Sequence, residues 1–137
     1  FDGDIGLANV DVQLGLTPQR DISSVLSGRH TLKEAITHYT EGGFDILAGR
    51  SGSATLATLP IEKLDKLAAS LLEMQKDYDF IIIDLGAGIE QHVQYLSSLA
   101  ARCIVVLTDE PTSLTDAYAF IKLCTNSKKH SNTPFSI

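Results

Sequence analysis

The chain has 137 residues, of which 44% are apolar and 20% charged, so it is long enough and apolar enough to bury a core as one domain. Its net charge of −6 argues against a broad basic surface for nucleic acid or anionic lipid. Its apolar runs are only a few residues long, which is far short of the roughly 20 residues that span a bilayer.

Short apolar runs alternate with helical patterns along the chain. Runs rich in Ile, Val and Phe are expected to be strands buried on both faces, and apolar residues spaced three or four apart indicate helices. In chain order the expected elements are a helix at 31–39, a strand at 44–48, a helix at 61–72, a strand at 80–83, a helix at 93–99, a strand at 103–107 and a helix at 114–121. This alternation predicts an α/β fold, a parallel sheet flanked by helices with right-handed crossovers.

Two capping signals mark helix starts. Thr31-Leu32-Lys33-Glu34 is a capping box, and Ser113 and Asp116 stand at capping spacing before the last helix. Cys103 and Cys124 form no CxxC pair, and no His stands near them at ligand spacing, so both are expected to be buried, reduced thiols. The four His residues are scattered, which disfavours a metal site built on His.

Three loops rich in Gly, Asp, Ser and Thr follow the three predicted strands. They comprise residues 48–53, 84–88 and 108–113. Ligands bind at the carboxyl ends of the strands in open parallel sheets, so we expect these loops to converge on one edge.

The apolar run 80–83 ends abruptly at Asp84. A carboxylate at the end of a buried strand is costly unless something compensates its charge. A divalent cation carried by a phosphate ligand would do so, as in the Walker B arrangement, where the Asp holds Mg²⁺ directly or through water. Gly86 and Gly88 would then let the backbone approach the phosphate. The alternative is an Asp that caps the next helix or turn.

A second group of carboxylates stands at the start of the chain. Asp2 and Asp4 point to the same side if this stretch is extended. Together with Asp84 they could surround one cation or one attacking water. A solvated acidic loop is the alternative interpretation.

Three stretches, in their order and spacing, resemble motifs of the MinD/ParA-family P-loop ATPases of the SIMIBI class. DGDIGLANVDVQLGL resembles the segment after their first helix, DYDFIIIDLGAGIEQHV their Walker B and switch II segment, and TDEPTSLTDAYAFIKL the segment after the next strand. Taken together, they are most similar to the flagellar-number regulators of that family, the FlhG/FleN group. Motif matches of this kind are hypotheses about the site.

The resemblance implies roles for three aspartates. Asp4 matches the switch I residue that orients the attacking water, and is the implied catalytic residue. Asp2 matches the Asp at the strand end near the metal, and Asp84 matches the Walker B Asp that engages Mg²⁺ through water.

The resemblance also implies nucleotide contacts. Gly86 and Gly88 match the switch II backbone near the γ-phosphate, and Glu110 and Pro111 match a loop near the nucleotide. The implied cofactors are ATP and Mg²⁺.

The family's Walker A loop, of the form KGGVGKT, precedes the first of these motifs and has no counterpart in this chain. Residues 1–137 are therefore expected to be the middle part of a single, incomplete MinD/ParA-like ATPase domain. Without the phosphate-binding loop, this chain is expected to hydrolyse nothing by itself.

For the full-length protein, the resemblance implies a cytoplasmic, nucleotide-switched regulator of flagellar number or placement that forms a homodimer with ATP. The implied partners are proteins, in the flagellar group a signal-recognition-type GTPase and motor components. Contact with the inner face of the membrane would come from outside this chain. Two alternatives stay open: a division or partition ATPase of the MinD or ParA type, and a non-catalytic α/β interaction module.

Overall fold

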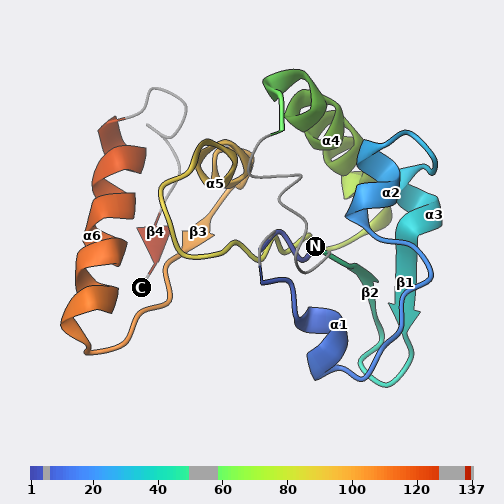
Figure 1. Cartoon of the computed structure of the whole chain (residues 1–137), viewed down its shortest axis with the longest axis horizontal. Helices are drawn as coiled ribbons and strands as arrows, with labels where there is room; N and C mark the ends of the chain where they lie inside the picture. The colour runs from blue at the N-terminus through green and yellow to red at the C-terminus, as the bar shows by residue number, and fades with distance from the viewer. Residues whose placement is uncertain (5–6, 50–58, 127–134, 137) are drawn as a thin grey trace. The chain divides into compact units, whose positions relative to one another are not determined.

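The computed structural model describes residues 1–4, 7–49, 59–126 and 135–136 of the chain (Figure 1). The chain divides into two compact units, Phe1–Gly86 and Ala87–Ile137. The first unit holds α1 (Val10–Gln13), α2 (Ile22–Leu26), α3 (Leu32–Ala35), β1 (Ile36–Tyr39), β2 (Phe44–Leu47), α4 (Ile61–Met74) and the 3-10 helix η1 (Gln75–Asp77). The second holds α5 (Gln91–Ser97), β3 (Cys103–Ile104), α6 (Pro111–Asn126) and β4 (Phe135–Ser136). The described residues form helices and two short two-stranded sheets, which is consistent with the predicted α/β class.

The strands β1 and β2 form an antiparallel hairpin, in which Ile36 pairs with Leu47 and Tyr39 with Phe44. The sequence predicted a helix that continues to Tyr39, and that prediction is wrong, because α3 ends at Ala35. The residues of β1 are β-branched or aromatic, which favours an extended strand once a partner strand is present. The hairpin therefore adds an antiparallel pair that the sequence did not predict.

The N-terminal segment, residues 1–3, is hydrogen-bonded to the residue that ends β2 and to Asp84. The backbone N–H of Asp2 donates to the Leu47 carbonyl at 3.0 Å, beside the end of β2. On its other side Asp2 forms a parallel bridge with Asp84, whose N–H donates to the Phe1 carbonyl at 2.9 Å. This contact is part of the expected parallel sheet, and it brings the ends of the two segments to the same edge.

The apolar run 80–83 is not buried on both faces, as the sequence predicted. Phe80 is 86% exposed and Ile82 77% exposed, whereas Ile81 and Ile83 are half-buried. Only the edge of this segment that faces residues 1–3 is hydrogen-bonded among the residues that the structure describes. The segment therefore has one hydrogen-bonded edge and one covered face. It forms an isolated bridge at Asp84 instead of a strand of several residues.

The strand at 103–107 is also shorter and more exposed than predicted. β3 pairs in parallel with β4 over two residues, Cys103 with Phe135 and Ile104 with Ser136. Ile104 is 69% exposed and Val106 90% exposed. The alternation of exposed and half-buried residues is typical of a strand with one covered face, so the prediction of two buried faces is wrong here as well.

Burial of an apolar stripe explains the helix α4. Its buried residues recur at helical spacing and face the core of the first unit: Leu64, Leu67, Ala68, Leu71 and Met74. Ile61 and Leu72, which the sequence placed on the same stripe, are 43% and 50% exposed. In the described part of the chain, no helix is long and apolar enough to cross a membrane.

The predicted caps differ in outcome. The Thr31–Glu34 capping box is present: the Glu34 N–H donates to Thr31 Oγ1 at 3.3 Å, and the Thr31 N–H donates to Glu34 Oε2 at 2.8 Å. In contrast, α6 begins at Pro111, so Ser113 and Asp116 lie inside the helix. Proline is favoured at the first helical position because its missing N–H needs no partner there.

In the second unit, the short helix α5 buries Val93 and Leu96, as predicted, and ends before Leu99. Both cysteines are free thiols, as expected; Cys124 is buried and Cys103 partly so. Burial raises the pKa of each thiol.

Candidate functional site

Asp2 is the buried centre of the candidate site in the first unit. It is only 2% exposed, and its Oδ2 accepts a hydrogen bond from the Val10 N–H at 3.2 Å. Its other oxygen, Oδ1, is buried and has no hydrogen-bond partner among the residues that the structure describes. Burial raises the pKa of the Asp2 carboxyl, the N–H groups of Val10, Asp4 and Asn9 oppose that rise, and the negative charge of Asp84 adds to it.

Asp4 lies directly against the backbone of Gly86. A Cβ atom placed on Gly86 would lie 2.7 Å from Asp4 Oδ1 and 3.0 Å from Asp4 Cγ. Any side chain at position 86 would therefore displace the carboxylate of Asp4. The structure thus brings together a predicted water-orienting residue and a predicted switch residue that are 82 positions apart in the sequence.

Asp84 completes the acidic end of the first unit, which we define as Asp2, Asp4 and Asp84 with the backbone of Gly86. Its backbone pairs with Asp2, and its side chain is exposed. Strand pairing therefore places the two aspartates side by side, with one carboxyl buried and the other in solvent.

These residues fit a cation held through water better than one held directly. Within the described residues, no group of three His, Cys, Asp or Glu side chains lies close enough together to hold a metal ion. The partnerless Oδ1 of Asp2, however, is an acceptor that a metal-bound water could satisfy. The metal roles of Asp2 and Asp84 stay predictions.

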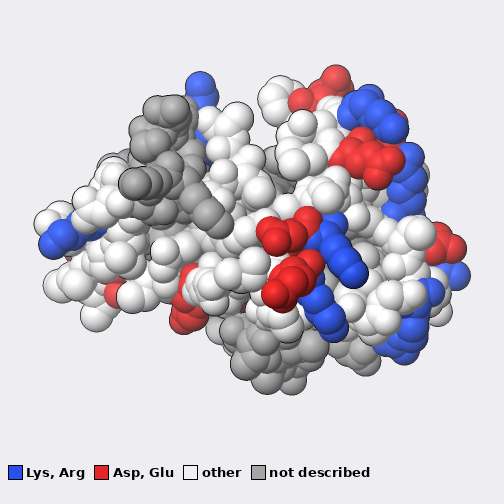
Figure 2. All heavy atoms as spheres, turned by 90° about the horizontal axis from the view of Figure 1, so that it is seen from above, with Lys and Arg blue, Asp and Glu red and all other residues white. Residues whose placement is uncertain are grey.

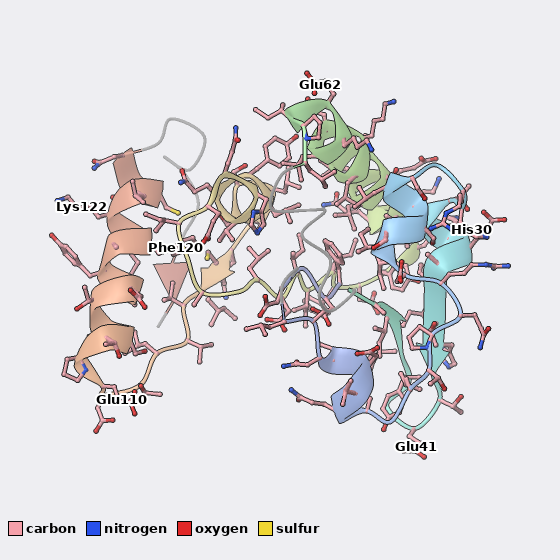
Figure 3. The ribbon with its side chains drawn as sticks, in the orientation of Figure 1. His30, Glu41, Glu62, Glu110, Phe120 and Lys122 are labelled. Carbon is pink, nitrogen blue, oxygen red and sulfur yellow. The ribbon has the colours of Figure 1, made fainter. Side chains whose placement is uncertain are left out.

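The other predicted nucleotide contacts belong to the second unit. Gly88 has a φ of 146°, in the region that favours glycine. Glu110 and Pro111 are exposed at the start of α6, where the Glu110 carbonyl accepts from the Leu114 N–H at 3.0 Å (Figure 3). Part of the first predicted loop, residues 50–53, lies outside the described residues.

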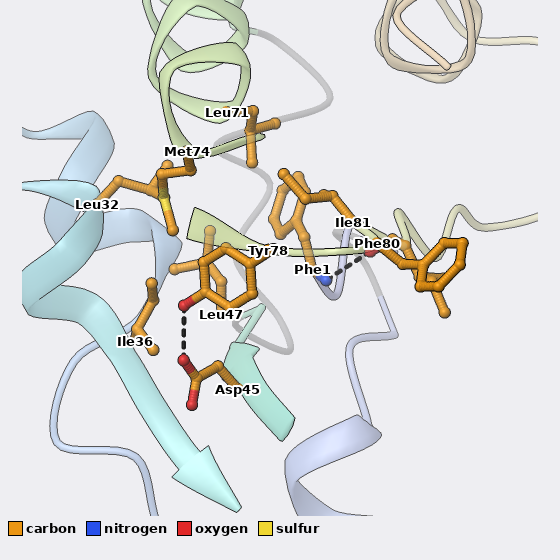
Figure 4. Close-up of a pocket in the computed structure, with 11 residues that line it drawn as sticks. Phe1, Leu32, Ile36, Asp45, Leu47, Leu71, Met74, Tyr78, Phe80 and Ile81 are labelled. Atoms are coloured by element: carbon orange, nitrogen blue, oxygen red, sulfur yellow. Dashed lines mark hydrogen bonds between the residues drawn. The ribbon is translucent and has the colours of Figure 1, made fainter. Parts of the chain in front are cut away.

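The hairpin carries a polar cluster that the sequence analysis missed, the Asp45 cluster, made of Asp45, His38 and Tyr78. The Tyr78 hydroxyl donates to Asp45 Oδ2 at 2.5 Å (Figure 4). On the other side, His38 Nδ1 lies 2.6 Å from Asp45 Oδ1. These bonds, first that of Tyr78 and then that of His38, lower the pKa of Asp45, while burial and the neighbouring carboxylate raise the pKa of Tyr78 to about 12. His38 and Asp45 are register partners in the hairpin, so only knowledge of that hairpin could have revealed the cluster.

A small pocket lies beside the Asp45 cluster (Figure 4). Its lining is largely apolar and comes from α3, β1, α4 and the segment 80–82, with Leu32, Ile36, Leu71, Met74, Tyr78 and Ile81 among the contributors. Its volume of about 80 Å³ is well below that of usual ligand sites, which are roughly 300–1,000 Å³. The pocket is therefore too small for a nucleotide, and the acidic end is the better candidate site.

The chain is similar in sequence to several known proteins. No family model matches it. It is 37% identical to the antiactivator FleN of Pseudomonas aeruginosa over 137 residues, which is all of this chain and 48% of FleN. It is 35% identical to the flagellum site-determining protein YlxH of Helicobacter pylori, covering 93% of this chain and 43% of that protein. The chain thus spans about half the length of these curated relatives.

Solved structures give the same picture for the fold. The MinD chain in the MinC:MinD cell division complex of Aquifex aeolicus matches 98% of this chain and 52% of its own length, with a TM-score of 0.76 and 30% identity. MinD of Pyrococcus horikoshii, solved as a complex with Mg-ADP, matches with a TM-score of 0.74 and 24% identity, covering 98% of this chain and 53% of its own. The chain therefore belongs to the MinD/ParA family of P-loop ATPases, as a homologue of the FleN/FlhG and MinD proteins.

Proposed function

We propose that this chain is the central part of a Mg²⁺-dependent ATPase that acts as a nucleotide-switched regulator of flagellar number or placement. The observation that carries the proposal is the acidic end, where strand pairing joins Asp2 to Asp84 and the backbone of Gly86 lies against Asp4. Residues from both ends of the first unit meet there, at the edge where ligands bind in α/β sheets. The similarity to FleN and YlxH supports the flagellar role, and the Mg-ADP complex of a structural relative supports the ligand.

In the proposed site, Asp4 holds and orients the attacking water. Asp4 is half-buried, and its carboxylate lies so close to Gly86 that a Cβ there would be 2.7 Å from Oδ1, so the two residues are already together before substrate binds. When bound, Mg²⁺ would neutralise the charge of the phosphates during transfer. Asp84 and Asp2 would hold the water molecules around the ion, and the unsatisfied Oδ1 of Asp2 is the acceptor best suited to this.

Gly86 couples the site to its surroundings in this proposal. Its backbone can approach the γ-phosphate only because it has no side chain, and any movement there acts directly on Asp4. Gly88, Glu110 and Pro111 are proposed as further contacts of the nucleotide. Through such contacts, ATP would favour a homodimer, and hydrolysis would release it.

The proposed partner is a protein and not a nucleic acid. The net charge is −6, and Figure 2 shows lysine and arginine side chains interspersed with acidic ones on the face that it displays. The solved complex of a related MinD with MinC supports a protein partner in general. In the flagellar group we propose a signal-recognition-type GTPase for this role, with the protein in the cytoplasm or at the inner face of the membrane.

Steady-state ATP hydrolysis by the full-length protein tests the proposal. Asp4→Ala should lower kcat by about 10²- to 10⁴-fold, as for other groups that position a reacting proton or water, and should leave ATP binding intact. Asp79→Ala is the matched control, because Asp79 is an exposed aspartate in the same unit, outside the acidic end. If Asp4→Ala and Asp79→Ala hydrolyse ATP equally fast, Asp4 has no catalytic role.

A non-catalytic α/β interaction module is the second candidate. One observation favours it: the described residues contain no group of three side chains that could hold a metal ion directly. A full-length protein that binds a protein partner equally well with ATP, with ADP and without nucleotide would support this candidate over the switch.

A further inference from the structure

Gly49 is buried two residues after the end of β2 and packs against Asp2 of the acidic end. A Cβ atom placed on Gly49 would lie 2.5 Å from the Cβ of Ala8, 2.9 Å from the backbone oxygen of Asp2 and 3.2 Å from Asp2 Cγ. Contacts under 3.0 Å with backbone atoms are not relieved by the rotation of a side chain. Something near Gly49 would have to move if it carried a side chain.

The backbone of Asp2 has little freedom to move away. Its N–H is bonded to the Leu47 carbonyl at 3.0 Å, and the next N–H, that of Gly3, is bonded to the Asp84 carbonyl at 2.8 Å. Ala8 is only 3% exposed, so it has no open space on its side. The Asp2 carboxyl accepts a hydrogen bond from the Val10 N–H at 3.2 Å, and its Cγ would lie 3.2 Å from the added Cβ. Because a side-chain torsion can turn while the hydrogen-bonded backbone of Asp2 cannot easily shift, we expect the carboxyl to be displaced.

We propose that Gly49 is a positioning residue for Asp2: its missing side chain leaves the space in which the Asp2 carboxyl is held against the Val10 N–H, facing the acidic end. The inference rests on the proposed function, in which Asp2 lies near the metal. Gly49 itself touches neither the nucleotide nor the ion in this proposal. Its effect on turnover passes through Asp2 alone.

Two readouts on the full-length protein separate positioning from a general loss of structure. The first is the Mg²⁺ concentration that gives half-maximal ATP hydrolysis. Gly49→Ala should raise it by about 10- to 100-fold, the usual effect of disturbing a group that supports a metal site. In an Asp2→Asn background, Gly49→Ala should add almost nothing, because the two changes act through the same carboxyl.

The second readout needs no metal and no activity. In metal-free, ¹⁵N-valine-labelled protein, the amide signal of Val10 should follow the ionisation of Asp2 as pH is varied, because Asp2 accepts the Val10 hydrogen bond. Gly49→Ala should abolish or strongly shift this titration. A Val10 titration identical to that of the wild type would overturn the proposal, as would an equal effect of Gly49→Ala with and without the Asp2 carboxylate.

A second-site variant controls for folding. Ala8→Gly/Gly49→Ala removes the contact between the two Cβ atoms and keeps the contact with Asp2. It should unfold at a higher temperature than Gly49→Ala and still show the altered Mg²⁺ dependence and Val10 titration. If both Gly49 variants fail to fold, Gly49 serves the fold in general and the proposal is wrong. If the wild type hydrolyses no ATP, the proposed function fails, while the Val10 titration still decides the role of Gly49.

Discussion

Asp2 and Asp45 are two aspartates of the first unit, and their surroundings shift their pKa values in opposite directions. Asp45 is hydrogen-bonded through both oxygens, by His38 and Tyr78, and its pKa is lowered. Asp2 is almost fully buried, one of its oxygens has no partner in the described part of the chain, and its pKa is raised. Within the Asp45 cluster, the carboxylate already has a hydrogen-bond partner on each oxygen, as expected for a structural group. Asp2 is in an environment that an additional ligand would improve, which is typical of functional sites.

The largest expected difference between the acidic end and the Asp45 cluster is in nucleotide binding. In the full-length protein, Asp84→Ala should weaken Mg²⁺-dependent ATP binding by about 10- to 100-fold, because it removes a group that supports the metal. ATP binding without Mg²⁺ should change little. Calorimetric titration with and without Mg²⁺ measures both.

Asp45→Ala provides the control for that experiment, since it removes a carboxylate of the same unit that lies in the Asp45 cluster. It should leave Mg²⁺-dependent binding unchanged. Equal weakening by Asp84→Ala and Asp45→Ala would remove the distinction between a functional and a structural region.

The next largest effect is on stability. Asp45→Ala leaves the Tyr78 hydroxyl and His38 without their partner, and we expect the free energy of unfolding to fall by about 1–3 kcal/mol. Tyr78→Phe, which removes one of the two bonds, should cost less, about 0.5–1.5 kcal/mol. Urea denaturation measures both changes. Asp79→Ala, at an exposed position, should stay within about 0.5 kcal/mol of the wild type, and a loss no larger than this for Asp45→Ala would refute the stabilising role of the cluster.

The smallest expected effect is in the pH dependence of stability, where the two aspartates have opposite signs. The folded pKa of Asp2 lies above its ordinary value of 3.8, so between these two pKa values the folded state binds more protons at Asp2 than the unfolded state does. The free energy of unfolding therefore falls as pH rises from 3.8 through the folded pKa of Asp2. The folded pKa of Asp45 lies below 3.8, so its contribution is present above that pH and is lost as pH falls through the lowered pKa.

Urea denaturation between about pH 3 and pH 8 tests these signs. Asp2→Asn should gain stability relative to the wild type as pH rises, and Asp45→Asn should lose it. The two difference curves would then slope in opposite directions. Curves that slope the same way would contradict the assigned environments.

Local signals in the sequence were reliable where a few neighbouring residues decide the outcome. The Thr31–Glu34 capping box formed as predicted, because both of its hydrogen bonds lie within one turn. The stripe of α4 was predicted in its centre, and wrong at Ile61 and Leu72. The start of α6 was misplaced because Pro111 begins the helix before the polar residues that resemble caps.

The sequence also indicated Asp2, Asp4, Asp84 and Gly86 as members of one site, but it could not supply their environments. The spacing of residues along the chain does not reveal that the Asp2 carboxyl is buried, with Oδ1 unpaired among the described residues, while Asp84 is exposed to solvent. Nor did it single out Gly49, whose importance is visible only from the atoms that a side chain there would meet.

From the sequence, residue types at short spacings predicted the α/β class, and the resemblance of three motifs predicted the family and the residues of the candidate site. Tertiary structure alone decided that residues 36–39 form a strand, that Phe80 and Ile82 are exposed, and that His38, Asp45 and Tyr78 form a cluster. Each of these depends on contacts between segments far apart in the chain. Strand partners and burial are set by those contacts, and propensity is too weak to fix them in advance.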